Sequence, residues 1–106
     1  MGGDMTELKI DGIYTVSDAN IVYVILEKKN DIYYMLECKT DGIKRNVILE
    51  FIKFHLNHGT DTKNFHFCHG RTYFMQNIDG YFGTISKQLH EKMMEKLQKQ
   101  FWYRMP

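Results

Sequence analysis

The chain has 106 residues, of which 43% are hydrophobic and 14% aromatic, and 14 basic against 13 acidic side chains give a formal net charge of +1. This length supports one hydrophobic core and excludes a second domain, while the apolar and aromatic content excludes a disordered chain. The near balance of charge excludes a strong uniform field for nucleic acid or an anionic membrane, so such binding would need a local patch.

Residues 1–106 are therefore expected to form a single cytoplasmic domain that does not enter a membrane. No apolar run is long enough to span a bilayer, and the start of the chain lacks the basic and apolar regions of a secretory signal. Residues 1–5 are expected to be disordered or a remnant of cloning, with no functional weight. Cys38 and Cys68 lie in apolar, strand-like surroundings, which predicts buried free thiols.

The first part of the chain predicts strands. Asp-Gly pairs at residues 11–12, 41–42 and 79–80 each precede an apolar, β-branched or aromatic run, as expected where a turn leads into a strand. Residues 21–26 and 32–38 flank a short polar break, and this arrangement predicts a β-hairpin.

Residues 46–57 predict a helix, because polar residues recur there at helical spacing and apolar residues fill the other face. Asn46 is the expected N-cap and Gly59 the expected stop. The β-branched start of this segment leaves an extended conformation as the alternative.

The last part of the chain predicts more strand and then a closing helix. The expected strand segments are residues 65–67 and 72–75, with a bulge or bend at Gly70 between them. The helix should begin after Ser86 as N-cap and lie across the sheet. Its apolar stripe consists of Leu89, Met93, Leu97 and Phe101.

Together these elements predict an α+β fold. Its sheet is expected to be a small SH3-like β-barrel or a strongly curved antiparallel sheet. An inserted helix and a C-terminal helix complete it.

If the protein cleaved RNA, His69 and Arg71 would be the best internal candidates for the catalytic groups. Metal-free cleavage needs a general base, a general acid and a cation on the phosphate. If residues 65–73 formed one unbroken strand, both side chains would project from the same face. The alternative is a locally bonded strand histidine and an arginine in a surface ion pair.

A nucleic-acid interface needs basic groups for phosphates and aromatic rings for bases. The candidates are Lys44, Arg45, Arg71, Thr72 and Tyr33, with Tyr34 as an alternative stacking ring. The favoured interpretation is a solvated hairpin edge whose lysines discourage edge pairing, since the overall charge is nearly balanced.

Four nitrogen and sulfur donors raise the hypothesis of a zinc site: His55, His58, Cys68 and His69. Adjacent residues of a strand point to opposite faces, so Cys68 and His69 would not converge on one metal ion. We assign no metal site and no cofactor.

Four residues near the end of the chain are candidates for binding a partner: Phe101, Trp102, Tyr103 and Arg104. Aromatic residues and arginine are enriched in the hot spots of protein interfaces. The alternative is that Phe101 and Trp102 fold back and complete the core.

Arg71-Thr72-Tyr73, the run Gly83-Thr84-Ile85-Ser86 and the helix pattern after it resemble the end of PemK/MazF-like toxins. In that family an Arg-Thr strand precedes an Ile-Gly-x-Leu-Ser/Asp turn and an amphipathic helix. The resemblance covers the last third of the chain and implies an SH3-like barrel, an endoribonuclease and a homodimer. Residues 15–20 lack the Arg-Pro pair of the family's N-terminal loop, so no family active-site residue is carried over.

Two functions of different class follow. The first is a small interaction module, such as a phage or mobile-element protein that binds and inhibits a host factor. The second is a PemK/MazF-like RNA-binding protein or metal-independent endoribonuclease toxin that acts on single-stranded RNA. The enzyme requires an arginine and a general base in one groove, whereas the module requires an apolar patch near Trp102.

Overall fold

A computed structural model describes residues 7–16, 20–58, 64–71 and 78–104 of the chain. These residues form, in chain order, β1 (Gly12–Val16), β2 (Ile21–Lys29), β3 (Ile32–Lys39), the 3-10 turn η1 (Arg45–Val47), α1 (Ile48–Asn57), β4 (Phe65–Arg71), β5 (Ile78–Thr84), α2 (Lys87–Leu97) and α3 (Phe101–Arg104). None of the helices in these ranges is long and apolar enough to cross a bilayer.

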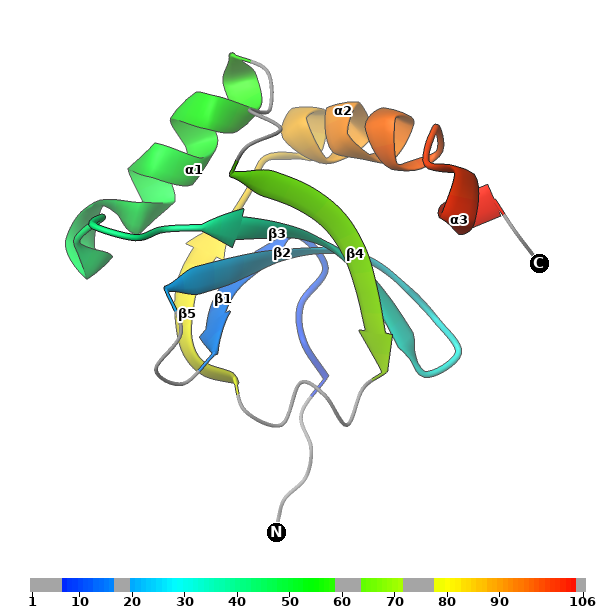
Figure 1. Ribbon diagram of the computed structural model, residues 1–106, viewed down its shortest axis with the longest axis horizontal. Helices are drawn as coiled ribbons and strands as arrows, with labels where there is room; N and C mark the ends of the chain where they lie inside the picture. The colour runs from blue at the N-terminus through cyan, green and yellow to red at the C-terminus, as the bar shows by residue number, and fades with distance from the viewer. Residues whose placement is uncertain (1–6, 17–19, 59–63, 72–77, 105–106) are drawn as a thin grey trace, which may run out of the picture.

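The strands form one antiparallel sheet in the order β4-β3-β2-β1-β5, and Figure 1 shows how strongly it curves. Pairing shifts register twice between β1 and β5 and once between β2 and β3. Such irregularities bend strands and increase their twist. Within the described residues β4 and β5 remain the two edges of the sheet. The predicted α+β class is confirmed, and its sheet is curved and open rather than a closed barrel.

The predicted hairpin is confirmed as β2 and β3, with a tighter turn than the polar break suggested. Lys29 pairs with Ile32, so Asn30 and Asp31 alone make the turn. Asn30 has a φ of 58°, a left-handed conformation that asparagine adopts more readily than most residues. The polar residues before the turn therefore belong to the strand.

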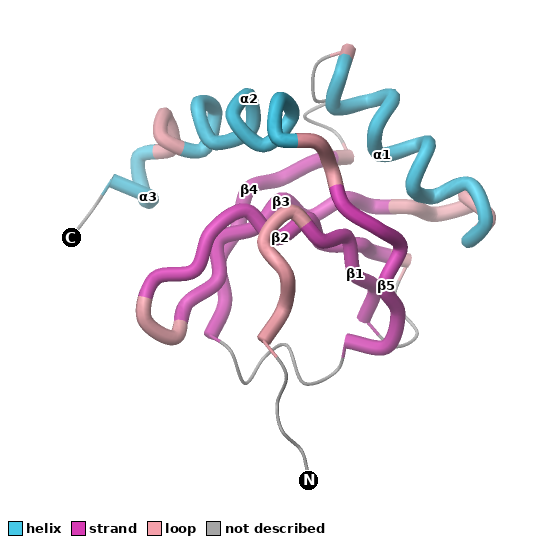
Figure 2. Tube along the Cα trace, turned by 180° about the vertical axis from the view of Figure 1, so that it is seen from behind, coloured by secondary structure: helices cyan, strands magenta, loops and turns pink. Residues whose placement is uncertain are grey.

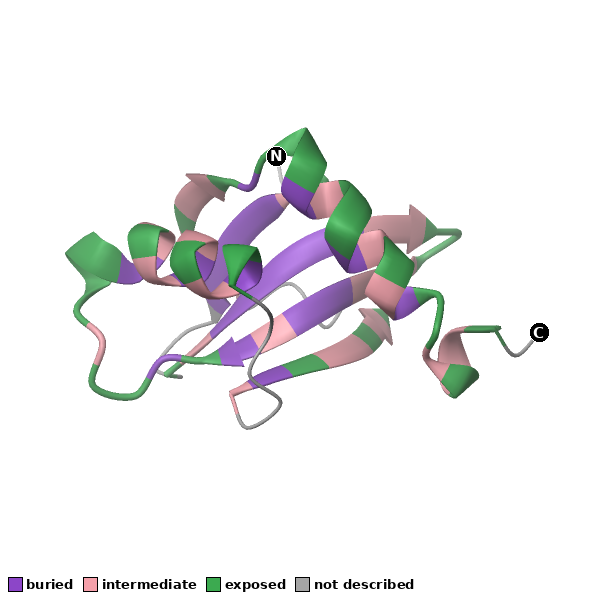
Figure 3. Cartoon of the chain, turned by 90° about the horizontal axis from the view of Figure 1, so that it is seen from above, coloured by how far each residue is buried: buried purple, intermediate pink, exposed green. Residues whose placement is uncertain are grey.

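The helices lie on the convex side of the sheet, as Figures 1 and 2 show. Alternate residues of the central strands, such as Val22, Val24 and Leu36, point toward them and are buried. From the helices, the core receives Ile48, Ile52, Leu56, Leu89, Met93 and Leu97. Figure 3 shows the same division, with buried strands beneath helices whose outer faces are exposed.

The concave side of the sheet carries a second buried cluster: Tyr14, Tyr23, Ile25, Tyr33 and Met35. Residues 22–26 are thus buried without interruption, because both faces of β2 are covered. This explains why the segment is a continuous apolar run rather than an alternating one.

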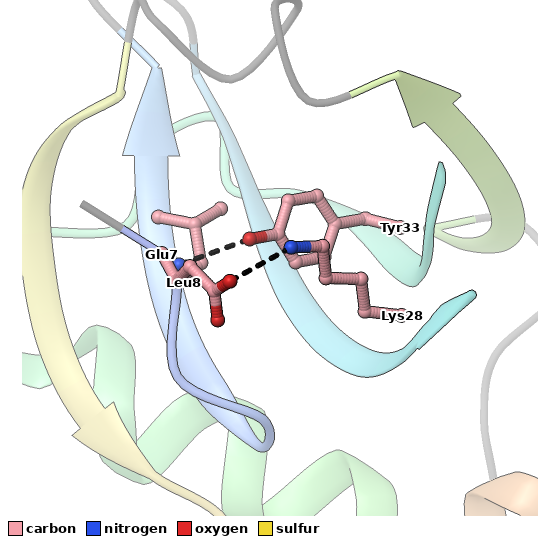
Figure 4. A network of polar contacts seen from close by, with 4 residues as sticks. All are labelled: Glu7, Leu8, Lys28 and Tyr33. Atoms are coloured by element: carbon pink, nitrogen blue, oxygen red, sulfur yellow. Dashed lines mark hydrogen bonds and ion pairs between the residues drawn. The ribbon is translucent and has the colours of Figure 1, made fainter. Parts of the chain in front are cut away.

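The segment at residues 7–10 passes along this concave side and is held by tyrosine hydroxyls. The backbone N–H of Leu8 donates to the Tyr33 hydroxyl at 3.1 Å, and that of Lys9 donates to the Tyr14 hydroxyl at 2.8 Å. Lys28 Nζ lies 3.0 Å from a carboxylate oxygen of Glu7 (Figure 4). Residues close to the start of the chain therefore help to cover the second cluster.

The closing helix begins where the sequence predicts. Ser86 is the N-cap of α2, and its Oγ accepts a hydrogen bond from the Leu89 N–H at 3.1 Å. Leu89, Met93 and Leu97 form the buried stripe. Extending that stripe to Phe101 was wrong, because α2 ends at Leu97 and Phe101 starts the separate helix α3.

Three local predictions also need correction. Asn46 is not an N-cap: it lies inside η1, and Val47 precedes α1 without a side-chain cap. The Asp-Gly pair at 41–42 leads toward η1, and the pair at 79–80 lies inside β5. Gly70 pairs with Tyr33 in unshifted register and so forms no bulge. Gly59 and residues 72–75 lie outside the described residues.

Candidate functional site

Trp102 and Tyr103 of α3 pack against the outer part of the β3–β4 pair. The Trp102 ring lies nearly parallel to Tyr34, with centroids 6.4 Å apart and planes at 7°. Tyr103 meets Tyr34 edge-on at 5.1 Å, and His69 lies 5.2 Å from Trp102. Offset-parallel and edge-on pairs at these separations are the favourable aromatic geometries. We call these four residues the aromatic anchor.

A polar contact fixes the same helix to β2. The Tyr103 hydroxyl donates to a Glu27 carboxylate oxygen at 2.5 Å, and Lys29 Nζ lies 4.5 Å from the Tyr103 ring centroid. Burial, and then the bond to Glu27, raises the pKa of the Tyr103 phenol. The phenol therefore keeps its proton and remains a donor at neutral pH.

Phe101 lies outside the anchor. It is 72% exposed, the highest value among the exposed large hydrophobic side chains of the described residues. Arg104 is also exposed, whereas Trp102 and Tyr103 are half-buried against the main core. The alternative of folding back onto the core therefore describes Trp102, while Phe101 faces solvent. The four tail residues divide into two that hold α3 in place and two that are presented outward.

His69 and Arg71 lie on one unbroken strand, because the β3–β4 register runs without a shift from Cys38 to Ile32. Residues two apart on such a strand share a face. Arg71 forms an exposed ion pair with Asp31 at 3.3 Å, and the His69 ring lies against Trp102 and Tyr34 within the aromatic anchor. The ion pair matches the alternative expected for Arg71, whereas the contacts of His69 are with aromatic rings rather than the local hydrogen bond that the alternative assumed.

The predicted phosphate-binding residues lie at opposite edges of the sheet. The Arg45 guanidinium lies 5.1 Å from the ring centroid of Phe82, which belongs to β5. It also lies over Gly80, where an added Cβ would come within 2.7 Å of its Nη2 atom. Arg71 belongs to the other edge strand, β4. Gly80 is therefore needed to seat Arg45 beside β5, far in the strand order from Arg71.

The other nucleic-acid candidates are not gathered with them. Lys44 is exposed at the start of η1, next to Arg45. Tyr33 is only 2% exposed in the concave cluster, so its ring faces are covered. Tyr34 packs against α3, and Thr72 lies outside the described residues.

The four proposed zinc donors are also separated. Cys68 packs on the concave cluster, while its neighbour His69 contacts Trp102 on the other side. His55 lies 4.4 Å from the Phe51 ring, and His58 Nδ1 lies 2.8 Å from the Phe54 carbonyl oxygen. In the described ranges no three histidine, cysteine or acidic side chains are close enough to hold a metal ion.

Sequence reasoning missed a contact between Asp11 and His90. His90 Nδ1 lies 2.5 Å from Asp11 Oδ1, and both side chains are largely buried. Asp11 has a φ of 72°, its N–H donates to the Ile25 carbonyl, and its own carbonyl accepts from the Ile85 N–H. The residues are far apart in the chain, so no local pattern pointed to their pairing.

An open groove of about 360 Å³ lies beside this pair, between residues 7–10 and α2. Its lining includes apolar Leu8, Leu26 and Met94, with Glu27 and His90 among its polar groups. A carboxylate can orient an imidazole as a general base, but catalysis also needs groups that stabilise developing charge. The other ionisable residues of the lining are Glu7 and Lys28, which pair with each other. We therefore assign Asp11 and His90 a structural role.

No protein-family profile matches the sequence, and no curated protein or solved structure matches it. The relation to PemK/MazF-like toxins therefore remains a prediction from its short motifs.

Replacing Asp11 should separate its backbone role from its charge. Asn keeps an oxygen acceptor for His90 and tolerates the positive φ, so Asp11→Asn should change the free energy of unfolding by less than about 0.5 kcal/mol. Asp11→Ala loses the acceptor and strains the turn, and should cost about 2 kcal/mol. Urea unfolding of both variants measures the difference, and equal losses would contradict this account.

Wild-type protein and Asp11→Asn should differ in the pH dependence of their stability. Burial raises the pKa of Asp11 above its ordinary 3.8, although His90 opposes the shift. The stability linked to this carboxyl is thus full below pH 3.8 and is lost as pH rises through the higher folded value. Wild-type protein should lose stability relative to Asp11→Asn over that interval, and parallel pH profiles would rule the shift out.

Both thiols should react slowly in the folded protein. Burial raises the pKa of Cys38 and Cys68 from 9.0 to about 12, which lowers the thiolate population at pH 8 about 1,000-fold. Labelling with a disulfide reagent at pH 8 should therefore follow global unfolding in urea. Cys68, only half-buried, gives the sharper test, and rapid native labelling there would refute the prediction.

Proposed function

We propose that the protein is a small interaction module that binds a protein partner through Phe101 and the exposed face of α3. The observation that carries this proposal is that Phe101 is 72% exposed on a helix held in place by its neighbours. Trp102 stacks on Tyr34 and Tyr103 bonds to Glu27, so α3 is ordered before any partner arrives. A contact residue that is already ordered loses less entropy on binding.

Such a module needs no catalytic group, which suits a phage or mobile-element protein that inhibits a host factor by occupying its surface. We propose that it acts in the cytoplasm. The two free cysteines support this setting, because thiols stay reduced there.

A PemK/MazF-like RNA-binding protein or endoribonuclease, as a homodimer, is the second candidate. The shared strand face of His69 and Arg71 favours it. The ion pair of Arg71 with Asp31 and the packing of His69 on Trp102 favour the interaction module instead.

Phe101→Ala should strongly weaken partner binding without unfolding the protein. Removing a central aromatic contact typically costs more than about 2 kcal/mol of binding, or about 30-fold in Kd. Because Phe101 is largely exposed, stability should change by less than about 0.5 kcal/mol. Affinity capture from cells of the organism that encodes the protein, compared by quantitative mass spectrometry, would show which proteins are lost.

Phe54→Ala is the matched control, since Phe54 is a second exposed phenylalanine, on α1, and is 58% exposed. Proteins that bind through α3 should be retained by this variant. If Phe101→Ala captured all the proteins that the wild type and Phe54→Ala capture, Phe101 would have no role in partner binding.

The second candidate has its own test. EDTA-treated protein should leave a pool of single-stranded RNA uncut if the interaction module is correct. Recurrent cut sites that disappear in the Arg71→Ala variant would instead establish a metal-independent endoribonuclease. Arg104→Ala serves as a control for the loss of an exposed arginine elsewhere.

A further inference from the structure

The helices α2 and α3 concentrate positive charge. Residues 87–104 contain five basic and two acidic residues, a net charge of +3, whereas the remaining nine basic and eleven acidic residues give −2. The basic residues are Lys87, Lys92, Lys96, Lys99 and Arg104. The nearly neutral chain is therefore strongly asymmetric in charge.

This charge is available at the surface. Four of the five basic residues are exposed, and Lys96 is half-buried. Among the residues that the structure describes, none of the five forms an ion pair. Unpaired like charges raise the local potential and attract a complementary surface.

The charge lies next to the exposed phenylalanine. Lys99 precedes Phe101 by two residues and Arg104 follows it by three. Figures 1 and 2 show α3 continuing from the end of α2 on the same side of the sheet. A partner that receives Phe101 would therefore also meet these two cations.

We infer that the partner surface is acidic and surrounds an apolar pocket, with Phe101 in the pocket and carboxylates facing Lys99 and Arg104. This inference rests on the proposed function and names the chemistry of its partner. An apolar centre with a complementary charged rim is the usual anatomy of a specific protein interface.

The same surface fits a protein better than single-stranded RNA. Base stacking needs open aromatic faces, but Trp102, Tyr103 and Tyr34 are half-buried against the core and one another, which leaves Phe101 as the exposed ring of α3.

The test selects short random displayed peptides on the wild-type protein, with counter-selection on Phe101→Ala. We expect the enriched peptides to combine acidic residues with an aliphatic or aromatic cluster. A synthetic peptide of the enriched sequence should bind more weakly as salt is raised, because screening reduces the attraction.

The Lys99→Glu variant, which reverses a charge near Phe101, should bind this peptide about tenfold more weakly than the wild type. Lys87→Glu is the matched control, because it changes net charge equally at the far end of α2. Lys87 begins the eleven-residue helix α2 and Lys99 follows its end, so the helix length of about 16 Å, roughly twice the Debye length at physiological salt, separates the two lysines. Binding by Lys87→Glu should stay close to that of the wild type.

The outcomes are distinguishable. Neutral or basic peptides that depend on Phe101, or equal losses in the two lysine variants, would overturn the inference and leave the proposed function intact. Failure to select any peptide that depends on Phe101 would overturn both. Binding of an oligouridine RNA that is lost in Phe101→Ala would also overturn the inference and identify nucleic acid as the ligand.

Discussion

The turn at Asp11 is the contact on which the arrangement of sheet and helices depends. Its left-handed backbone directs the N–H to Ile25 in β2 and the carbonyl to Ile85, just after β5. Its carboxylate binds His90, one turn into α2. One residue therefore joins the start of β1, the middle of β2 and the passage from β5 to α2. Since β5 pairs only with β1 among the described strands, this turn also fixes the edge of the sheet beneath the helices.

Burial on both faces of the central strands gives the sheet its second constraint. The helices cover one face. Residues 7–10 extend along the other face, where their backbone N–H groups donate to the hydroxyls of Tyr14 and Tyr33. A one-residue slip of β2 would exchange the members of two differently shaped clusters, one aliphatic and one rich in tyrosine. The tyrosines suit the concave side because their rings fill it while their hydroxyls bind the passing backbone.

Sequence patterns predicted the parts of the fold that local interactions decide. The β2–β3 hairpin follows from two apolar runs around a polar break, and the start of α2 follows from Ser86 and the stripe after it. The stripe could not reveal that the helix stops at Leu97, because the same spacing continues to Phe101 in the sequence. Tertiary contacts decide where the helix ends, because the chain changes direction after Leu97 so that Trp102 contacts Tyr34 and Tyr103 bonds to Glu27. For the same reason the tail could be identified as a candidate surface, but not divided into anchoring and exposed residues. The pairing of Arg71 with Asp31 likewise depends on sheet register that no local pattern contains.

The aromatic anchor also bears on the order in which the chain folds. Tyr103 and Glu27 are 76 residues apart, and His90 and Asp11 are 79 apart, so both contacts close very long loops. Contacts of this kind form late, because closing a long loop costs conformational entropy before the contact can stabilise the chain. The β2–β3 hairpin closes a short loop and can nucleate early. A nascent or partly folded chain could therefore contain most of its sheet while α3 is still undocked. Phe101 would then be attached to a mobile segment, without fixed cations beside it. A partner that recognises the docked arrangement would thus select chains that have completed folding.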